Sequence, residues 1–451
     1  MNSYHAKPKE LAMYVFKYLE QTKKKNKPSI PTLEELFDVM FYASMNTEEG
    51  EMIKVNIIYF NPNSWWHPTN ENLLSDEWRF AKFDMPIEFN IKNLVKLAKA
   101  ADPWSSSLAV FADDSHNLQI YGMIDQSLHT QSYMNHETDF KPDQAGIFQA
   151  TITGIGNLAV IYRFDLIATL KHNVLVTEFL DVLRSGPIAQ SIKSRTEYQR
   201  KDLGSFRFNS KIHLEHQNLL TNVWRSAISR LLIHVRNYNH GGAILITDNF
   251  DEIKIKYPIQ YGRLSHVIYH FALTTKSNES LLKQIQDFGD SPIDNSKYQM
   301  SKIFEELLKS SSNELKGAIR FIASQSCVDG LIIFNNKLDV EGFGGVIKKI
   351  DPPETVYQAD NAIIRKSKLI ERSTKEFGTR HQSMISFCWH NPNSFGFVIS
   401  QDGDIRAIKK VEDKLIIWEN IKTQRYLKVK SKNRVLKSWQ SFEQINFIDS
   451  P

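Results

Sequence analysis

Two long amphipathic helices, each leading into a glycine-led apolar strand, constrain the fold of this chain more than any other feature. Apolar residues recur at helical spacing over 219–235, and the chain then enters 240–246, which contains a pair of glycines. The same order returns at 303–322 and 329–334, with Gly241 of the first copy where the second has Asp329. The repetition fits either two related halves or the ordinary recurrence of helix and strand in α/β proteins. We predict an α/β fold in which a central mixed β-sheet is flanked by helices.

Composition indicates a folded chain without membrane spans. Of 451 residues, 41% are hydrophobic and 11% aromatic, enough for a sizeable core. No segment approaches the ~20 apolar residues that cross a bilayer, and the first ten residues lack an apolar signal core. Cys327 and Cys388 lie far apart without zinc-type spacing, so we expect inert core thiols. The expectation is a cytoplasmic protein with no membrane partner.

The charge balance fits phosphate ligands and gives little support to nucleic-acid binding. Lysine and arginine number 56 against 51 acidic residues, a net charge of +5. Basic residues gather at 23–27 and again at 422–437. Both stretches are interpreted as solvated segments, and nucleic acid is an unlikely partner.

The N-terminal region is predicted to be α/β. Thr32 to Glu35 form a capping-box pattern ahead of a helical stripe, and 55–60 has strand character. Two hairpins are predicted, over 108–124 and over 148–162. The second contains a GxG sequence, interpreted as a turn because it lacks the third glycine and following helix of a nucleotide loop.

Breaks in pattern suggest the domain boundaries. An apolar, helix-like stretch closes at 179–183, and the polar, basic stretch 191–207 is a candidate internal boundary or mobile loop. The polar stretch 275–297, with its glycine and proline, is expected to hold the main boundary. The predicted parts are an N-terminal α/β sensor region, a second regulatory part with a helix and a Gly-Gly strand, and a catalytic domain with a basic tail, at 1–205, 206–290 and 291–451.

Asp329 and Gly330 stand at the mouth of the buried strand that follows them. A glycine here lets a ligand approach the backbone closely, and a carboxylate can hold a divalent cation. A glycine-rich loop at 342–346 follows, containing Gly344. Alone, such an aspartate is usually only a turn residue, and its importance here comes from the residues that accompany it.

The pattern from Gly378 to His381 predicts the start of a helix that can bind phosphate. Thr379 is expected at the N-cap with Gln382 reaching back to it, a capping box. Free backbone N–H groups at a helix start attract anions. Arg380 adds planar charge-assisted hydrogen bonds, and His381 adds a donor. An ordinary capped surface helix is the alternative.

Asp402 supplies a second carboxylate. It follows the buried strand 395–399, in the turn from Ser400 to Asp404, where Asp402-Gly403 favours a hairpin. Mg²⁺ and Mn²⁺ usually take one or two protein carboxylates together with phosphates and water. Asp329 and Asp402 are therefore candidate ligands for one such ion.

These three segments resemble the diadenylate cyclase (DAC) domain over residues 301–420. The family has an Asp-Gly-Ala triplet, then Gly-Thr-Arg-His-Arg opening a helix, then a strand ending in a polar turn such as Ser-Glu-Glu. The corresponding residues are Asp329-Gly330-Leu331, Gly378 to Gln382, and Ser400-Gln401-Asp402. The preceding part, with 41–50 and 240–242, is similar to sensor regions attached to some DAC domains.

The resemblance implies that two such domains face each other and condense two ATP into cyclic di-AMP, releasing two pyrophosphates, with Mg²⁺ or Mn²⁺. Self-association, at least as a transient dimer, follows from that chemistry. Asp329, Arg380 and His381 would be catalytic, and Asp329 and Asp402 would bind the metal. The implied nucleotide-binding residues are Gly330, Leu331, Gly344, Thr379, Arg380, His381, Ser400, Gln401 and Asp402.

The chain departs from the family pattern at three positions. Leu331 replaces the alanine, Gln382 the second arginine, and Gln401 a glutamate. The two glutamines motivate an alternative, a non-catalytic sensor of nucleotides or cyclic dinucleotides built on a degenerate DAC fold.

Overall fold

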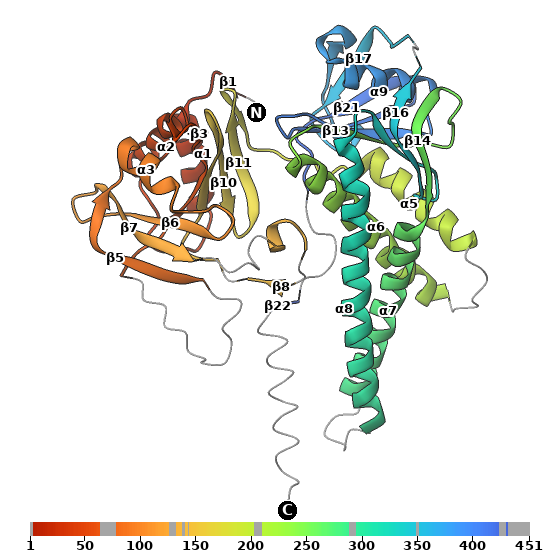
Figure 1. The fold of residues 1–451 in the computed structure, drawn as a ribbon, viewed down its shortest axis with the longest axis horizontal. Coiled ribbons are helices and arrows are strands. Elements are labelled where there is room, and N and C mark those ends of the chain that lie inside the picture. The colour runs from red at the N-terminus through yellow and green to blue at the C-terminus, as the bar shows by residue number, and fades with distance from the viewer. Residues whose placement is uncertain are drawn as a thin grey trace, which may run out of the picture. The chain divides into compact units, whose positions relative to one another are not determined.

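The computed structural model describes residues 3–63, 78–125, 132–137, 140–142, 144–202, 210–287, 295–348, 351–423 and 430–431. The chain forms two compact units, Met1–Glu178 with Val429–Pro451, and Phe179–Lys428 (Figure 1). In the described part, each unit is built on its own nine-stranded sheet with helices packed against it. The mixed α/β fold predicted from the sequence is confirmed.

The sheet of the first unit is mostly antiparallel. Its one parallel pair among the described strands joins β4 to β6. In spatial order the strands are β1 (Ser3–Tyr4), β12 (Val174–Val176), β11 (Asp165–Lys171), β10 (Asn157–Tyr162), β9 (Gln149–Gly154), β4 (Val55–Tyr59), β6 (Ser106–Ala112), β7 (Leu118–Asp125) and β5 (Arg79–Glu88). Two small pairs lie outside this sheet, β2 (Thr47–Glu48) with β3 (Glu51–Met52), and β8 (Phe140–Lys141) with β22 (Lys430–Ser431).

Among the described residues, three helices share an apolar core with this sheet: α1 (Pro8–Glu20), α2 (Ile30–Ala43) and α3 (Ile91–Ala98). Both predicted hairpins are present, as β6–β7 and β9–β10. The predicted capping box is wrong. Helix α2 starts earlier, and its N-cap is Ser29, whose hydroxyl accepts a hydrogen bond from the Thr32 N–H. Pro31 in the first turn suits this earlier start, because a proline there leaves no N–H unsatisfied.

The sheet of the second unit is mixed. Its parallel pairs are β13 with β15 and β17 with β21. In spatial order the strands are β14 (Ile253–Tyr261), β16 (Val340–Ile347), β15 (Leu331–Phe334), β13 (Gly242–Ile246), β19 (Phe395–Ile399), β20 (Ile405–Val411), β21 (Lys414–Trp418), β17 (Thr355–Ala359) and β18 (Leu369–Ser373). The helices of this unit are α5 (Gly186–Asp202), α6 (Ser210–Asn237), α7 (Arg263–Asp287), α8 (Asn295–Ser324) and α9 (Thr379–His390).

Helices cover both faces of this sheet, as its uninterrupted apolar strands require. Strand β13 shows the division: Ile244 and Ile246 belong to the core beneath α5 to α8, whereas Ala243 and Leu245 belong to the core beneath α9. All five residues of β13 are buried. In Figure 1, α6, α7 and α8 run side by side below the sheet.

The compact units divide the chain differently from the predicted boundaries at 205 and 290. Strand β13 lies between β15 and β19, so residues assigned to a separate regulatory part form the middle of the second sheet. Within the polar stretch 275–297, residues 275–287 form the C-terminal end of α7 and residues 295–297 form the start of α8. Residues 288–294 lie outside the described residues. Residues 277, 279 and 280 of α7 face solvent, and a polar helix surface resembles a linker in composition.

Three local predictions also differ from the structure. Of the stretch 191–207, residues 191–202 are part of α5 rather than a mobile loop, and 203–207 lie outside the described residues. Residues 179–183 are not helical, and Leu180 forms a β-bridge with Ile421. Cys388 is buried as expected, whereas Cys327 is exposed, in a 3-10 turn (Gln325–Cys327). No helix in the part of the chain that the structure describes is long and apolar enough to cross a membrane.

Candidate functional site

The three DAC-like segments, called here the three motifs, are 329–331, 378–382 and 400–402. They lie at one end of the central strands of the second unit. Parallel strands β13 and β15 both begin at this end, just after Gly241 and Gly330. Strand β19 runs antiparallel to β13 and finishes there, before Ser400. The topology therefore brings together residues that lie about 160 positions apart in the sequence.

Asp329 and Arg380 form the direct contact between two of the motifs. An Asp329 Oδ1 oxygen lies 3.6 Å from Arg380 Nη2. The Asp329 side chain is 94% exposed and that of Arg380 33% exposed. A long, exposed ion pair contributes at most about 1 kcal/mol to stability. The pair therefore constrains the two side chains only weakly and leaves the carboxylate open to a ligand or cation.

Gly241, which was not predicted to belong to the site, lies between Arg380 of the second motif and Gln401 of the third. Its φ is +65°, a conformation that favours glycine. A Cβ added there would lie 2.7 Å from Arg380 Nη1, 2.9 Å from the Ile399 carbonyl oxygen and 3.2 Å from the Gln401 nitrogen. The signal in the sequence was the glycine pair 241–242, interpreted as an echo of Asp329-Gly330 and as part of a sensor-like region.

Gly330 and Gly344 bring two backbone segments into contact beside Asp329. Gly330 has φ +123°, and an added Cβ would lie 2.5 Å from the Gly344 carbonyl carbon. Gly344 itself has φ +64°. Leu331, the next residue, pairs with Ala243 and Gly345 and is 5% exposed. Its side chain therefore packs in the core on the α9 side of the sheet.

The start of helix α9 differs from the prediction in one respect. Its N-cap is Gly378 rather than Thr379, and no side-chain hydrogen bond caps it, so the predicted capping box is wrong. Gln382 instead donates from its amide to the carbonyls of Phe377, at 2.7 Å, and Thr374, at 3.3 Å. Because the first-turn N–H groups are not capped by a side chain, the helix start can receive an anion.

His381 is buried beside an arginine network. Arg406 Nη1 lies 3.1 Å from His381 Nε2. The same guanidinium donates from Nε to Glu419 Oε1 at 2.6 Å, and Gln358 donates to the other Glu419 oxygen. Burial, then Arg406 and Arg380, lower the pKa of His381 to about 4, against an opposing effect of Asp404. An arginine can only donate, so Nε2 accepts, and the neutral ring carries its proton on Nδ1.

The low pKa of His381 makes stability pH-dependent. In the unfolded chain this histidine titrates near 6.5, so as pH falls from 6.5 toward 4 the unfolded state binds a proton that the folded state refuses. We expect wild type to lose about 2 kcal/mol between pH 7.5 and pH 5 that His381→Gln does not lose. Urea unfolding at both pH values measures the difference.

His390→Gln, at the other end of α9, is the matched control and should keep the wild-type pH dependence. Equal losses in wild type and His381→Gln would contradict the assignment.

The turn between β19 and β20 is a hairpin, as predicted. Gly403 N–H donates to the Ser400 carbonyl, and Asp404 N–H donates to the Ser400 hydroxyl at 3.1 Å. Gln401 and Asp402 are exposed. The described residues contain no group of three or more His, Cys, Asp or Glu side chains able to hold a metal ion. A cation held by Asp329 or Asp402 would thus need phosphate oxygens and water to complete its coordination.

Comparison with known proteins bears on the N-terminal unit. Residues 22–125 match the family model described as probable sensor domain DACNV. Sensor domains of this family are associated with diadenylate cyclases. The match ends well before the three motifs and before Gly241. No curated protein matches the chain. Residues 22–125 of the first unit are thus similar to a probable sensor domain of a kind associated with diadenylate cyclases.

Proposed function

We propose that this chain is a diadenylate cyclase, whose second unit condenses two ATP into cyclic di-AMP and whose first unit regulates it. The observation that carries the proposal is the convergence at Gly241. There Arg380, Gln401 and, through Arg380, Asp329 are held at one end of the sheet. The sensor match to residues 22–125 supports the same assignment.

The proposed reaction joins two nucleotides held by two facing copies of the second unit. The 3′-hydroxyl oxygen of each ATP attacks the α-phosphorus of the other. Each attack forms one phosphodiester bond, breaks one α–β phosphoanhydride bond, and releases pyrophosphate and the hydroxyl proton. Catalysis of this kind depends mainly on positioning and on neutralising phosphate charge.

The proposed role of each residue in this reaction follows from its chemistry. The uncapped N–H groups at the start of α9, beginning with Thr379, and the Arg380 guanidinium would bind phosphate oxygens. The neutral His381 can donate one hydrogen bond through Nδ1 while Arg406 fixes its ring. Gly330 and Gly344 let the nucleotide approach the backbone, and Ser400, Gln401 and Asp402 would border the phosphates.

Asp329 fits the role of a metal ligand and orienting carboxylate. It is an oxygen donor on an exposed turn, the type of ligand that Mg²⁺ and Mn²⁺ prefer. The bound ion would neutralise phosphate charge, with Asp402 as a second carboxylate. The exposure of Asp329 also suits a site completed by a second copy of the unit.

Product analysis of the full chain tests the proposal. Purified protein is incubated with ATP and Mg²⁺ or Mn²⁺ in separate reactions, and products are identified by mass spectrometry. Cyclic di-AMP with pyrophosphate is the expected result. A different cyclic dinucleotide from other nucleoside triphosphates would keep the chemistry and change the substrate. No product from any nucleotide, with or without residues 1–178, would overturn the proposal.

A nucleotide or cyclic-dinucleotide sensor is the second candidate. Gln382 favours it, because this side chain caps the backbone carbonyls of Thr374 and Phe377 and brings no charge to a phosphate. Binding of ATP or cyclic di-AMP in calorimetry, without turnover under any metal, would establish this function in place of the first.

A further inference from the structure

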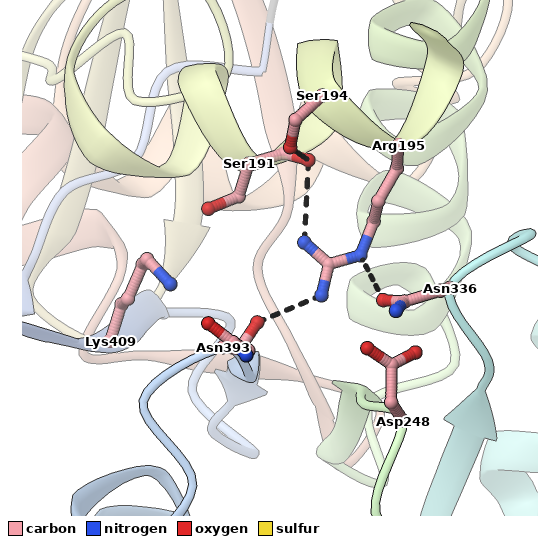
Figure 2. A pocket seen from close by; sticks show the side chains of 7 residues that line it. All are labelled: Ser191, Ser194, Arg195, Asp248, Asn336, Asn393 and Lys409. Carbon is pink, nitrogen blue, oxygen red and sulfur yellow. Dashed lines mark hydrogen bonds between the residues drawn. The ribbon is translucent and has the colours of Figure 1, made fainter. Parts of the chain in front are cut away.

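A polar pocket lies in the second unit, at the opposite end of β13 and β19 from the three motifs. It has a volume of about 270 Å³. Figure 2 shows the side chains that line it, Ser191, Ser194, Arg195, Asp248, Asn336, Asn393 and Lys409. Asp248 follows the end of β13, and Asn393 precedes β19. Five strand residues separate the two sites, a distance of roughly 17 Å at about 3.4 Å per residue.

Arg195 is a buried cation at this pocket. It is only 7% exposed, and its guanidinium lies 4.9 Å from the centre of the Phe395 ring. Its three hydrogen bonds go to neutral oxygens, the Asn336 side chain at 2.8 Å, the Asn393 carbonyl at 2.8 Å and the Ser191 carbonyl at 3.3 Å. A guanidinium has five N–H donors, so two remain for a ligand.

Lys409 faces Arg195 across the pocket. Figure 2 shows its amine directed toward the guanidinium, with the Ser191 hydroxyl on the same side. Lys409 donates to the Pro392 carbonyl at 2.9 Å. Burial first, and then Arg195, lower the pKa of Lys409 to about 8. Two cations held close together without an intervening anion are electrostatically unfavourable, and a bound anion would relieve that repulsion.

Asp248 only partly offsets these charges. Its carboxylate is exposed, and it raises the pKa of Arg195 against the larger effect of burial, which brings that pKa down to about 10. Charges of +2 and −1 leave the pocket with a net positive charge. Hydroxyl groups of Ser191 and Ser194 and the amide groups of Asn336 and Asn393 supply neutral hydrogen-bonding groups around it.

We propose that this pocket binds a small phosphate-bearing ligand through Arg195 and Lys409, at a site separate from that of the three motifs. A phosphate group keeps negative charge on several oxygens and accepts hydrogen bonds from several directions, as the groups around this pocket would require, whereas a carboxylate is planar. The volume is just under the usual ~300–1,000 Å³ of small-molecule pockets and suits a small phosphate monoester. The proposal does not depend on the cyclase assignment.

Calorimetric titration of the full chain tests this site. The probes are inorganic phosphate, glycerol 3-phosphate and, as the carboxylate comparison, acetate. Lys409→Met should weaken phosphate binding 10-fold or more. The control Lys410→Met changes the adjacent lysine, whose amine lies 4.0 Å from the Trp389 ring centre, and should bind like wild type. Arg195→Gln is a poorer test, because Arg195 also links three segments of the fold.

The relative affinities of the three probes identify the ligand class. Tighter binding of glycerol 3-phosphate than of inorganic phosphate would identify a monoester as the ligand class, and the reverse would identify free phosphate. No phosphate binding to wild type, equal binding of acetate, or binding unchanged by Lys409→Met would overturn the proposal. Phosphate affinity lost in Arg380→Met would place the anion at the other site and also overturn it.

Binding should also weaken as pH rises through about 8, where Lys409 loses its proton. The groups that act on this amine are Arg195 from α5 and Cys388 from α9, and the pKa of that buried thiol is raised to about 12, so it stays neutral. Lys409→Arg should retain binding to higher pH. The same loss of affinity in wild type and Lys409→Arg would contradict a role for the Lys409 charge.

Discussion

Asp329→Asn should reduce cyclic di-AMP synthesis at least ~100-fold while leaving the fold intact, if the second unit is the cyclase proposed here. The substitution keeps the size of the side chain and removes its charge, and with it a ligand for the divalent cation. Loss of one preorganised charged group at a reacting centre typically costs about 10²–10³ in rate. Because the side chain is 94% exposed, the free energy of unfolding should change by no more than about 0.5 kcal/mol.

The measurement is initial-rate product formation, with ATP binding followed separately by calorimetry. Asp413→Asn is the matched control, an equally conservative change in the exposed turn between β20 and β21. It should retain wild-type activity. Turnover by Asp329→Asn within a few-fold of wild type would remove Asp329 from the mechanism.

Local pattern was sufficient to predict most of the individual elements. The helices over 219–235 and 303–322 have an apolar periodicity of helical spacing, and the strands at 243–246 and 331–334 are uninterrupted apolar runs, which suits burial on both faces. The hairpins were predictable because Asp, Asn and Gly determine turns over four or five residues. The N-caps were harder to predict. The N-cap is Ser29 rather than Thr32 in α2, and Gly378 rather than Thr379 in α9. The sequence alone does not decide between candidates one to three positions apart.

The division into units could not be predicted in the same way. A boundary depends on which strands pair, and β13 pairs with β15 and β19, some 90 and 150 residues further along the chain. The polar ends of α7 and α8 have the composition of a linker, although both are helical where described. Composition therefore placed a boundary inside what is one sheet.

The candidate site, too, was only partly predictable from local sequence. Asp329, Arg380 and His381 belong to short motifs with recognisable spacing. Arg406 and Glu419 do not, because their importance comes from lying on β20 and just after β21, next to the start of α9. A single arginine on a strand carries no local sign that it will fix a histidine 25 positions earlier.

Gly241→Ala tests whether the strand assigned by sequence to the regulatory part belongs to the site. Alanine at φ +65° costs about 1 kcal/mol. The added methyl would also lie 2.9 Å from the Ile399 carbonyl and 2.7 Å from Arg380 Nη1. The guanidinium is flexible and should move, so we expect a stability loss of about 1–3 kcal/mol and an activity loss of at least ~10-fold, since small displacements of positioning groups are costly.

Gly317→Ala is the opposite control. Gly317 lies in helix α8, and an added Cβ would meet nothing within 4 Å. The change should stabilise the protein by about 0.5–1 kcal/mol and leave activity unaltered. Thermal unfolding and product formation, measured on both variants, separate damage to the fold from damage to the site. If Gly241→Ala lost stability but kept full activity, Arg380 would not need its observed position, and the convergence at Gly241 would be structural rather than catalytic.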